Sequence, residues 1–66
     1  MNELEAVKMI TEMIWNDLGK QDRKELIESL EEDLAIMKGK EGKEELAKGT
    51  EQYISELHYR FNKIYN

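Results

Sequence analysis

Residues 2–18 read NELEAVKMITEMIWNDL, and this stretch decides the fold of the 66-residue chain. Good helix formers dominate it, and no window alternates apolar and polar residues as a half-buried strand does. At about 100° per residue, its apolar side chains cover roughly two-thirds of a helix circumference. We therefore predict a helix over residues 2–18 with more apolar surface than two neighbouring helices can cover.

Two further helices are predicted downstream. Residues 22–38 carry one narrow apolar stripe and residues 43–65 carry a longer one, in phase with helical spacing. Gly19 suits the left-handed position after the first helix. Asp22 suits the N-cap of the second helix, because Glu25 follows three residues later as in a capping box.

Gly49 lies inside the third predicted helix, where a glycine costs about 1 kcal/mol relative to alanine. Thr50 can cap a new helix directly after it, so a break at this point is the alternative. We predict one continuous helix because the apolar stripe keeps its phase across the glycine. A continuous helix predicts that Gly49→Ala raises the melting temperature.

These segments together predict an all-α fold, a small three-helix bundle with helices at about 2–18, 22–38 and 43–65 in a single domain over residues 1–66. A chain this short buries only about 60% of the surface that its unfolded state exposes. It contains no cysteine, so disulfides cannot compensate. The excess apolar surface of the first helix therefore predicts a homodimer, either packed or intertwined.

The composition excludes several classes of protein. The chain has 15 acidic residues against 10 basic ones and a net charge of −5. No apolar run is long enough to span a bilayer, so we expect no membrane insertion. The acidic beginning, Met1 to Glu5, lacks the basic region of a secretory signal. We therefore expect a cytoplasmic protein.

We expect no catalytic residue, metal ligand or cofactor, and no enzymatic activity. The single histidine, His58, follows Ser55 by three residues, but a bundle of this size offers no pocket that excludes water or supplies an oxyanion hole. Ser55 also occupies the place of the carboxylate in a Glu-x-x-His metal motif. Residues 31–33 are consecutive acids without the spacing of a calcium loop, and we interpret them as a solvated face.

The sequence favours partner binding over chemistry. The first hypothesis is a non-enzymatic protein–protein interaction module that binds a larger protein and inhibits or adapts it. The acidic first half of the chain suits a basic surface on that partner. The candidate partner-binding residues are the excess apolar residues of the first helix and two apolar residues outside the stripes, namely Met9, Ile10, Met13, Ile14, Trp15, Ile36 and Tyr59.

Two alternative functions stay open. The first is a structural or assembly protein that acts through self-association. The second is a nucleic-acid-binding regulator that uses the C-terminal helix, where residues 58–65, HYRFNKIY, mix aromatic and basic side chains. A nucleic-acid footprint requires a basic face, and the net charge of −5 opposes contact with phosphates.

Overall fold

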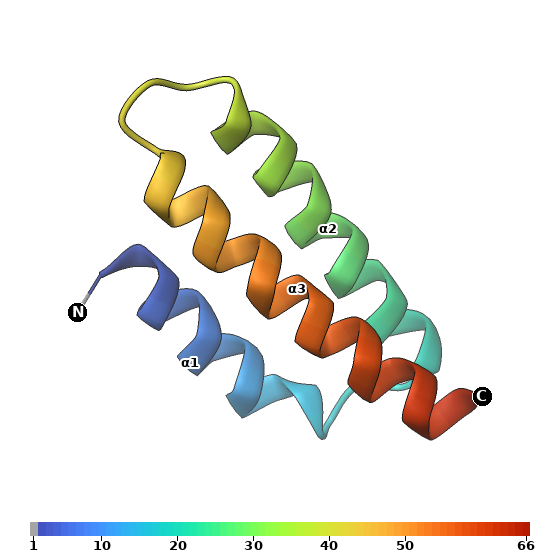
Figure 1. Ribbon diagram of the computed structural model, residues 1–66. Coiled ribbons are helices and arrows are strands. Elements are labelled where there is room, and N and C mark those ends of the chain that lie inside the picture. Colours follow the sequence, from blue (N-terminus) through green and yellow to red (C-terminus); the bar gives the residue numbers. More distant parts are fainter. Residues whose placement is uncertain (1) are drawn as a thin grey trace.

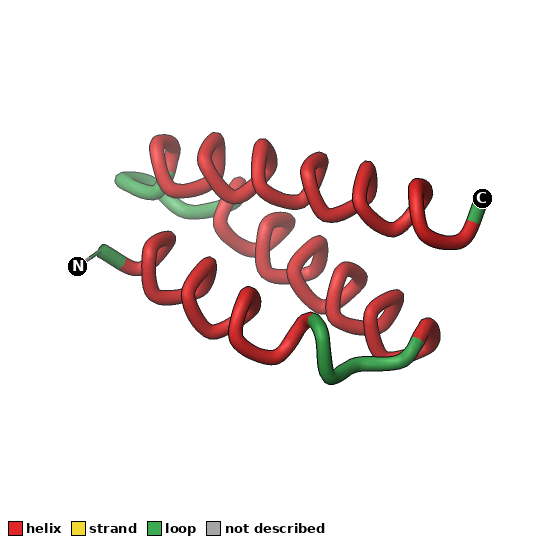
Figure 2. Tube along the Cα trace, turned by 90° about the horizontal axis from the view of Figure 1, so that it is seen from below, coloured by secondary structure: helices red, strands yellow, loops and turns green. Residues whose placement is uncertain are grey.

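The computed structural model describes residues 2–66 and contains three helices within them: α1 (Glu3–Trp15), α2 (Lys20–Lys38) and α3 (Glu44–Tyr65). The prediction of an all-α three-helix bundle is confirmed. Helix α3 runs between α1 and α2 in Figure 1. Seen from below, α3 lies on one side of the other two helices, so the three do not form a flat layer (Figure 2).

Helix α3 is the central element of the bundle. It packs along α2 and also contacts α1, whereas α1 and α2 contact each other only weakly. The buried core draws on all three helices, with α3 supplying half of its members: Trp15, Ile27, Leu30, Tyr53, Ile54 and Leu57. Because α1 rests mainly on a single neighbour, much of its circumference remains uncovered.

The connection between α1 and α2 differs from the prediction. Helix α1 ends at Trp15 rather than at residue 18, because Asp17 N donates to the Ile14 carbonyl at 3.0 Å and closes a turn. Gly19 was predicted in the left-handed region after α1. It is instead the N-cap of α2, in extended backbone at φ −79° and ψ 179°.

The predicted N-cap at Asp22 is wrong, because α2 begins at Lys20 and Asp22 lies in its first turn. There its carboxylate still interacts favourably with the helix dipole. The next residue, Arg23, contributes to the early start, since its Nε donates at 3.0 Å to the carbonyl of Trp15. This bond satisfies an acceptor at the end of α1 and ties the first turn of α2 to it.

The two helix boundaries at the α2–α3 connection follow the sequence closely. Helix α2 ends at Lys38, as predicted, and α3 begins at Glu44, within one residue of the prediction. The chain turns between them at Gly42, whose φ of 80° is readily adopted only by glycine. Helix α3 is continuous through Gly49, so the alternative of a broken helix is wrong.

Gly49 allows α1 to approach α3 closely. A Cβ atom built at this position would lie 2.5 Å from Cδ2 of Leu4. Alanine at this position would gain about 1 kcal/mol in helix propensity. It would also displace the Leu4 side chain, and this displacement opposes the gain. The sequence-based expectation for Gly49→Ala considered only the propensity.

We now expect Gly49→Ala to raise the melting temperature in a Leu4→Ala background but not in the wild-type protein. Thermal unfolding followed by circular dichroism on the four proteins of this double-mutant cycle measures the coupling. Equal shifts in both backgrounds would show that the two residues do not touch.

Candidate interaction surface

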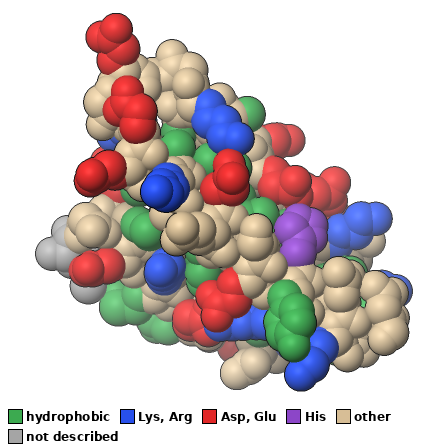
Figure 3. Space-filling model, viewed as in Figure 1, with side chains coloured by type: hydrophobic (Ala, Val, Ile, Leu, Met, Phe, Trp, Pro, Cys, Tyr) green, Lys and Arg blue, Asp and Glu red, His purple; other side chains and the backbone are tan. Residues whose placement is uncertain are grey.

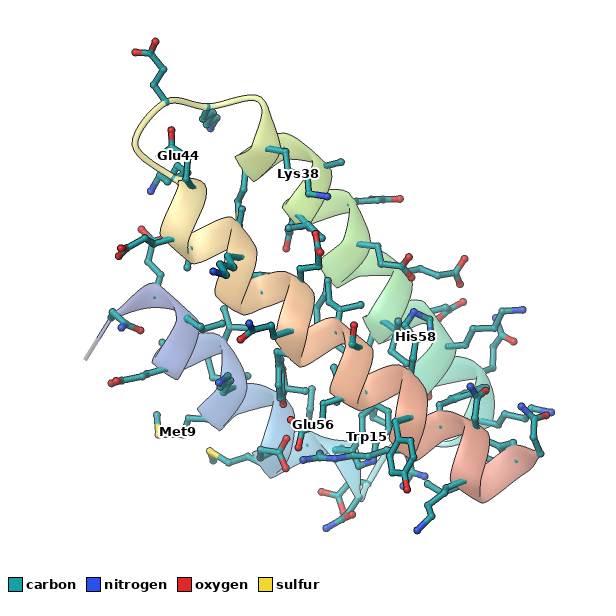
Figure 4. All side chains as sticks on the ribbon, in the orientation of Figure 1. Met9, Trp15, Lys38, Glu44, Glu56 and His58 are labelled. Atoms are coloured by element: carbon teal, nitrogen blue, oxygen red, sulfur yellow. The ribbon has the colours of Figure 1, made fainter. Side chains whose placement is uncertain are left out.

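Four large apolar side chains of α1 face solvent. Their exposed fractions are 48% for Met9, 56% for Ile10, 71% for Met13 and 39% for Ile14. We call these four residues the α1 face. Met9 points away from α2 and α3 in Figure 4, and hydrophobic side chains gather at the edge of the molecule over α1 in Figure 3.

The opposite side of α1 packs on α3. Its buried residues are Thr11, which is 3% exposed, and Trp15, which is 5% exposed. Thr11 interrupts the apolar surface in the sequence pattern, yet in the structure it lies at the helix contact. At about 100° per residue, Met9 and Met13 are turned well away from Trp15, and Ile14 lies toward the margin of the buried side. The apolar residues of α1 are therefore divided between a core side and a solvent side.

The remaining candidate residues do not join the α1 face. Trp15, a candidate partner-binding residue, belongs to the core, so its side chain is not part of the α1 face. Ile36 is exposed and lines a hollow with Glu3 and Asp33, near the beginning of α1. Tyr59 is exposed on α3, where the ammonium of Lys63 lies 5.4 Å from its ring centroid. The structure thus brings together four of the seven predicted residues.

A polar cluster fixes α1 to α3 beside this surface. The carboxylate of Glu12 accepts a hydrogen bond from the Tyr53 hydroxyl at 2.5 Å and bonds from Arg60 Nη1 at 2.8 and 2.9 Å. Arg60 Nη2 also donates to Glu56 at 3.3 Å. These bonds orient α1 so that its face remains turned outward. Sequence reasoning missed this cluster, because the spacing between residues 12, 53 and 60 gives no local signal.

The cluster lowers the pKa of Glu12 and raises the pKa values of Tyr53 and Arg60. The Tyr53 hydroxyl and then the Arg60 guanidinium donate to Glu12 and lower the pKa of its carboxyl from the ordinary value of 4.5. Burial raises the pKa of Tyr53, and its hydrogen bond to the Glu12 carboxylate raises it further. The native state therefore favours an ionised Glu12 and a protonated Tyr53.

The lowered pKa of Glu12 predicts acid destabilisation. The unfolded state takes up the proton first, so the stability that Glu12 contributes is fully present above pH 4.5. It is lost as the pH falls below that value toward the lower pKa of the folded state. We expect the free energy of unfolding of Glu12→Gln, measured by urea titration, to depend less on pH in this window. An unchanged pH dependence would show that Glu12 does not contribute to acid destabilisation.

Other polar groups form surface contacts. His58 Nε2 lies 3.4 Å from Glu31 Oε1, between α3 and α2. Within residues 2–66, no group of three or more His, Asp or Glu side chains is arranged to hold a metal ion. Nor does this part of the chain contain a helix with the length and apolar character needed to cross a membrane.

Comparisons of the chain with protein-family models, with curated proteins and with solved structures find no match.

Proposed function

We propose that the protein is a non-enzymatic interaction module that docks on a larger protein through the α1 face and thereby inhibits or adapts it. The proposal is carried by one observation. Four large apolar side chains on one helix are exposed, and none of them belongs to the buried core. Contiguous exposed apolar patches on small soluble proteins commonly mark binding sites. The proposal includes the cytoplasmic location expected from the sequence.

The total surface supports this proposal. The chain exposes 4847 Å², whereas a compact monomer of 7.8 kDa is expected to expose about 4400 Å². The accessible surface of the molecule is therefore about a tenth larger than that expected for a monomer of its mass. Burying the exposed part of each side chain of the α1 face would contribute on the order of 1 kcal/mol.

Met13→Asp tests the proposal, because Met13 is the most exposed residue of the face and its replacement leaves the core intact. Tyr59→Asp is the matched control, since it adds the same charge at another exposed apolar side chain, on α3. The assay is a pull-down from cell lysate with the full chain as bait. We expect the wild type and Tyr59→Asp to retain the same partner protein, and we expect Met13→Asp not to retain it. The retained protein is then purified, and its own activity is measured with and without the bait.

Two results would contradict the proposal. Retention of the same protein by Met13→Asp would exclude the α1 face as the docking site. Open-ended assembly of the purified wild type in sedimentation, abolished by Met13→Asp, would instead support the structural alternative, in which self-association is the function.

A further inference from the structure

The charges around the α1 face indicate what chemistry its occupant has. Acidic residues border the face on its own segment: Glu3, Glu5 and Glu12 in α1, and Asp17 in the turn that follows. The only basic residue of α1, Lys8, lies away from the face with its ammonium 5.6 Å from the ring centroid of Tyr53. On its own segment, the border of this apolar surface is therefore negative.

Two of these acids are available to a partner. Glu3 pairs with Lys43 at 3.4 Å, and Glu12 pairs with Arg60 at 2.8 Å. Glu5 and Asp17 form no ion pair with any group in residues 2–66. Along the chain they flank the face, with Glu5 in α1 before it and Asp17 in the turn after it.

A second copy of the chain fits this border poorly. In an antiparallel pair of α1 helices centred on the face, Glu5 of one copy would lie near Asp17 of the other. In a parallel pair, each acid would lie opposite itself. Like charges in such positions are repulsive, and the net charge of −5 on each copy adds to the repulsion.

We propose that the α1 face binds an amphipathic helix of another protein, one whose apolar stripe carries Lys or Arg at both ends. The proposal rests on the function proposed above and specifies its partner. A helix suits the face because Met9, Ile10, Met13 and Ile14 form a short straight stripe that side chains at helical spacing can interdigitate with. From Glu5 to Trp15, the last residue of α1, the helix rises about 15 Å. About 10 residues of a partner helix span this length.

Three synthetic peptides of about 18 residues, long enough to form a helix, test this pairing. The first has a Leu and Ile stripe bordered by Lys, the second has the same stripe bordered by Glu, and the third has a Ser stripe bordered by Lys. Fluorescence anisotropy measures the Kd of each for the full chain. We expect the first peptide to bind about tenfold more tightly than either of the others.

Charge reversal on the protein gives the second arm of the test. Asp17→Lys is expected to remove the preference for the Lys-bordered peptide over the Glu-bordered one. Glu41→Lys changes the net charge by the same amount in the α2–α3 turn, and it should leave that preference nearly unchanged. Equal effects of the two variants would show only general attraction between an acidic protein and a basic peptide, and would overturn the proposal.

Two further outcomes separate this inference from the proposed function. A dimer of the wild type that Met13→Asp converts to monomer would make a second copy the occupant and would overturn the inference. A natural partner that requires Met13 but shows no preference for a basic border would also overturn it, while leaving the proposed function standing. If Met13→Asp retains the natural partner, the α1 face is not the docking site. That result would overturn both the proposed function and this inference.

Discussion

Leu57→Ala is expected to lower the free energy of unfolding by about 2–5 kcal/mol and to leave the chain largely unfolded. Leu57 is the one large side chain in the described residues with no exposed surface, and it lies in α3 among core residues of all three helices. The hydrophobic core of a domain of this size rarely supplies more than about 3–5 kcal/mol of net stability. The loss of this one side chain therefore removes most of it.

Circular dichroism without denaturant measures the folded fraction of this variant, and urea unfolding measures the stability of the wild type and of the control. Ile64→Ala is the matched control, because Ile64 lies on the same helix but is 53% exposed. A surface truncation of this kind changes stability by no more than about 0.5 kcal/mol. Similar losses for the two variants would contradict the burial of Leu57 at the centre of the core.

The apolar stripe of α3 could be predicted from the sequence, but the orientation of α1 could not. Only one side of α3 is strongly apolar, so Tyr53 and Leu57 could face only the core. Helix α1 is apolar on more than one side, and counting apolar residues cannot decide which side packs. The side that packs includes Thr11, and the hydrogen bonds of Glu12 to Tyr53 and Arg60 fix the helix in this orientation.

The start of α2 illustrates a second limit of the sequence. The spacing of Asp22 and Glu25 is a sound local signal for a helix N-terminus. It was overridden by a tertiary contact, since Arg23 reaches back to the carbonyl of Trp15 and also donates to the Tyr65 hydroxyl at 3.2 Å. Bonds between residues this far apart in the chain leave no periodic trace in the sequence.

Trp15→Ala decides whether this residue is a core element or a docking anchor. Its indole is 5% exposed, and the guanidinium of Arg23 lies 5.1 Å from the ring centroid. Removing the ring opens a cavity between α1 and α3 and also removes the cation–π contact. We expect the free energy of unfolding to fall by about 3–5 kcal/mol, as for other buried tryptophans. A surface anchor would instead lose partner binding with little change in stability.

Two further variants help to distinguish a core residue from a docking anchor. Trp15→Phe keeps an aromatic ring at the contact and should retain much of the stability that alanine loses, because less volume is removed from the core. Met13→Ala truncates a residue that is 71% exposed and should unfold almost as the wild type does. Since Trp15 is the only tryptophan, its fluorescence also reports burial directly in the wild-type protein. A native emission spectrum as red-shifted as that of the unfolded chain would place the indole in water and return Trp15 to the docking surface.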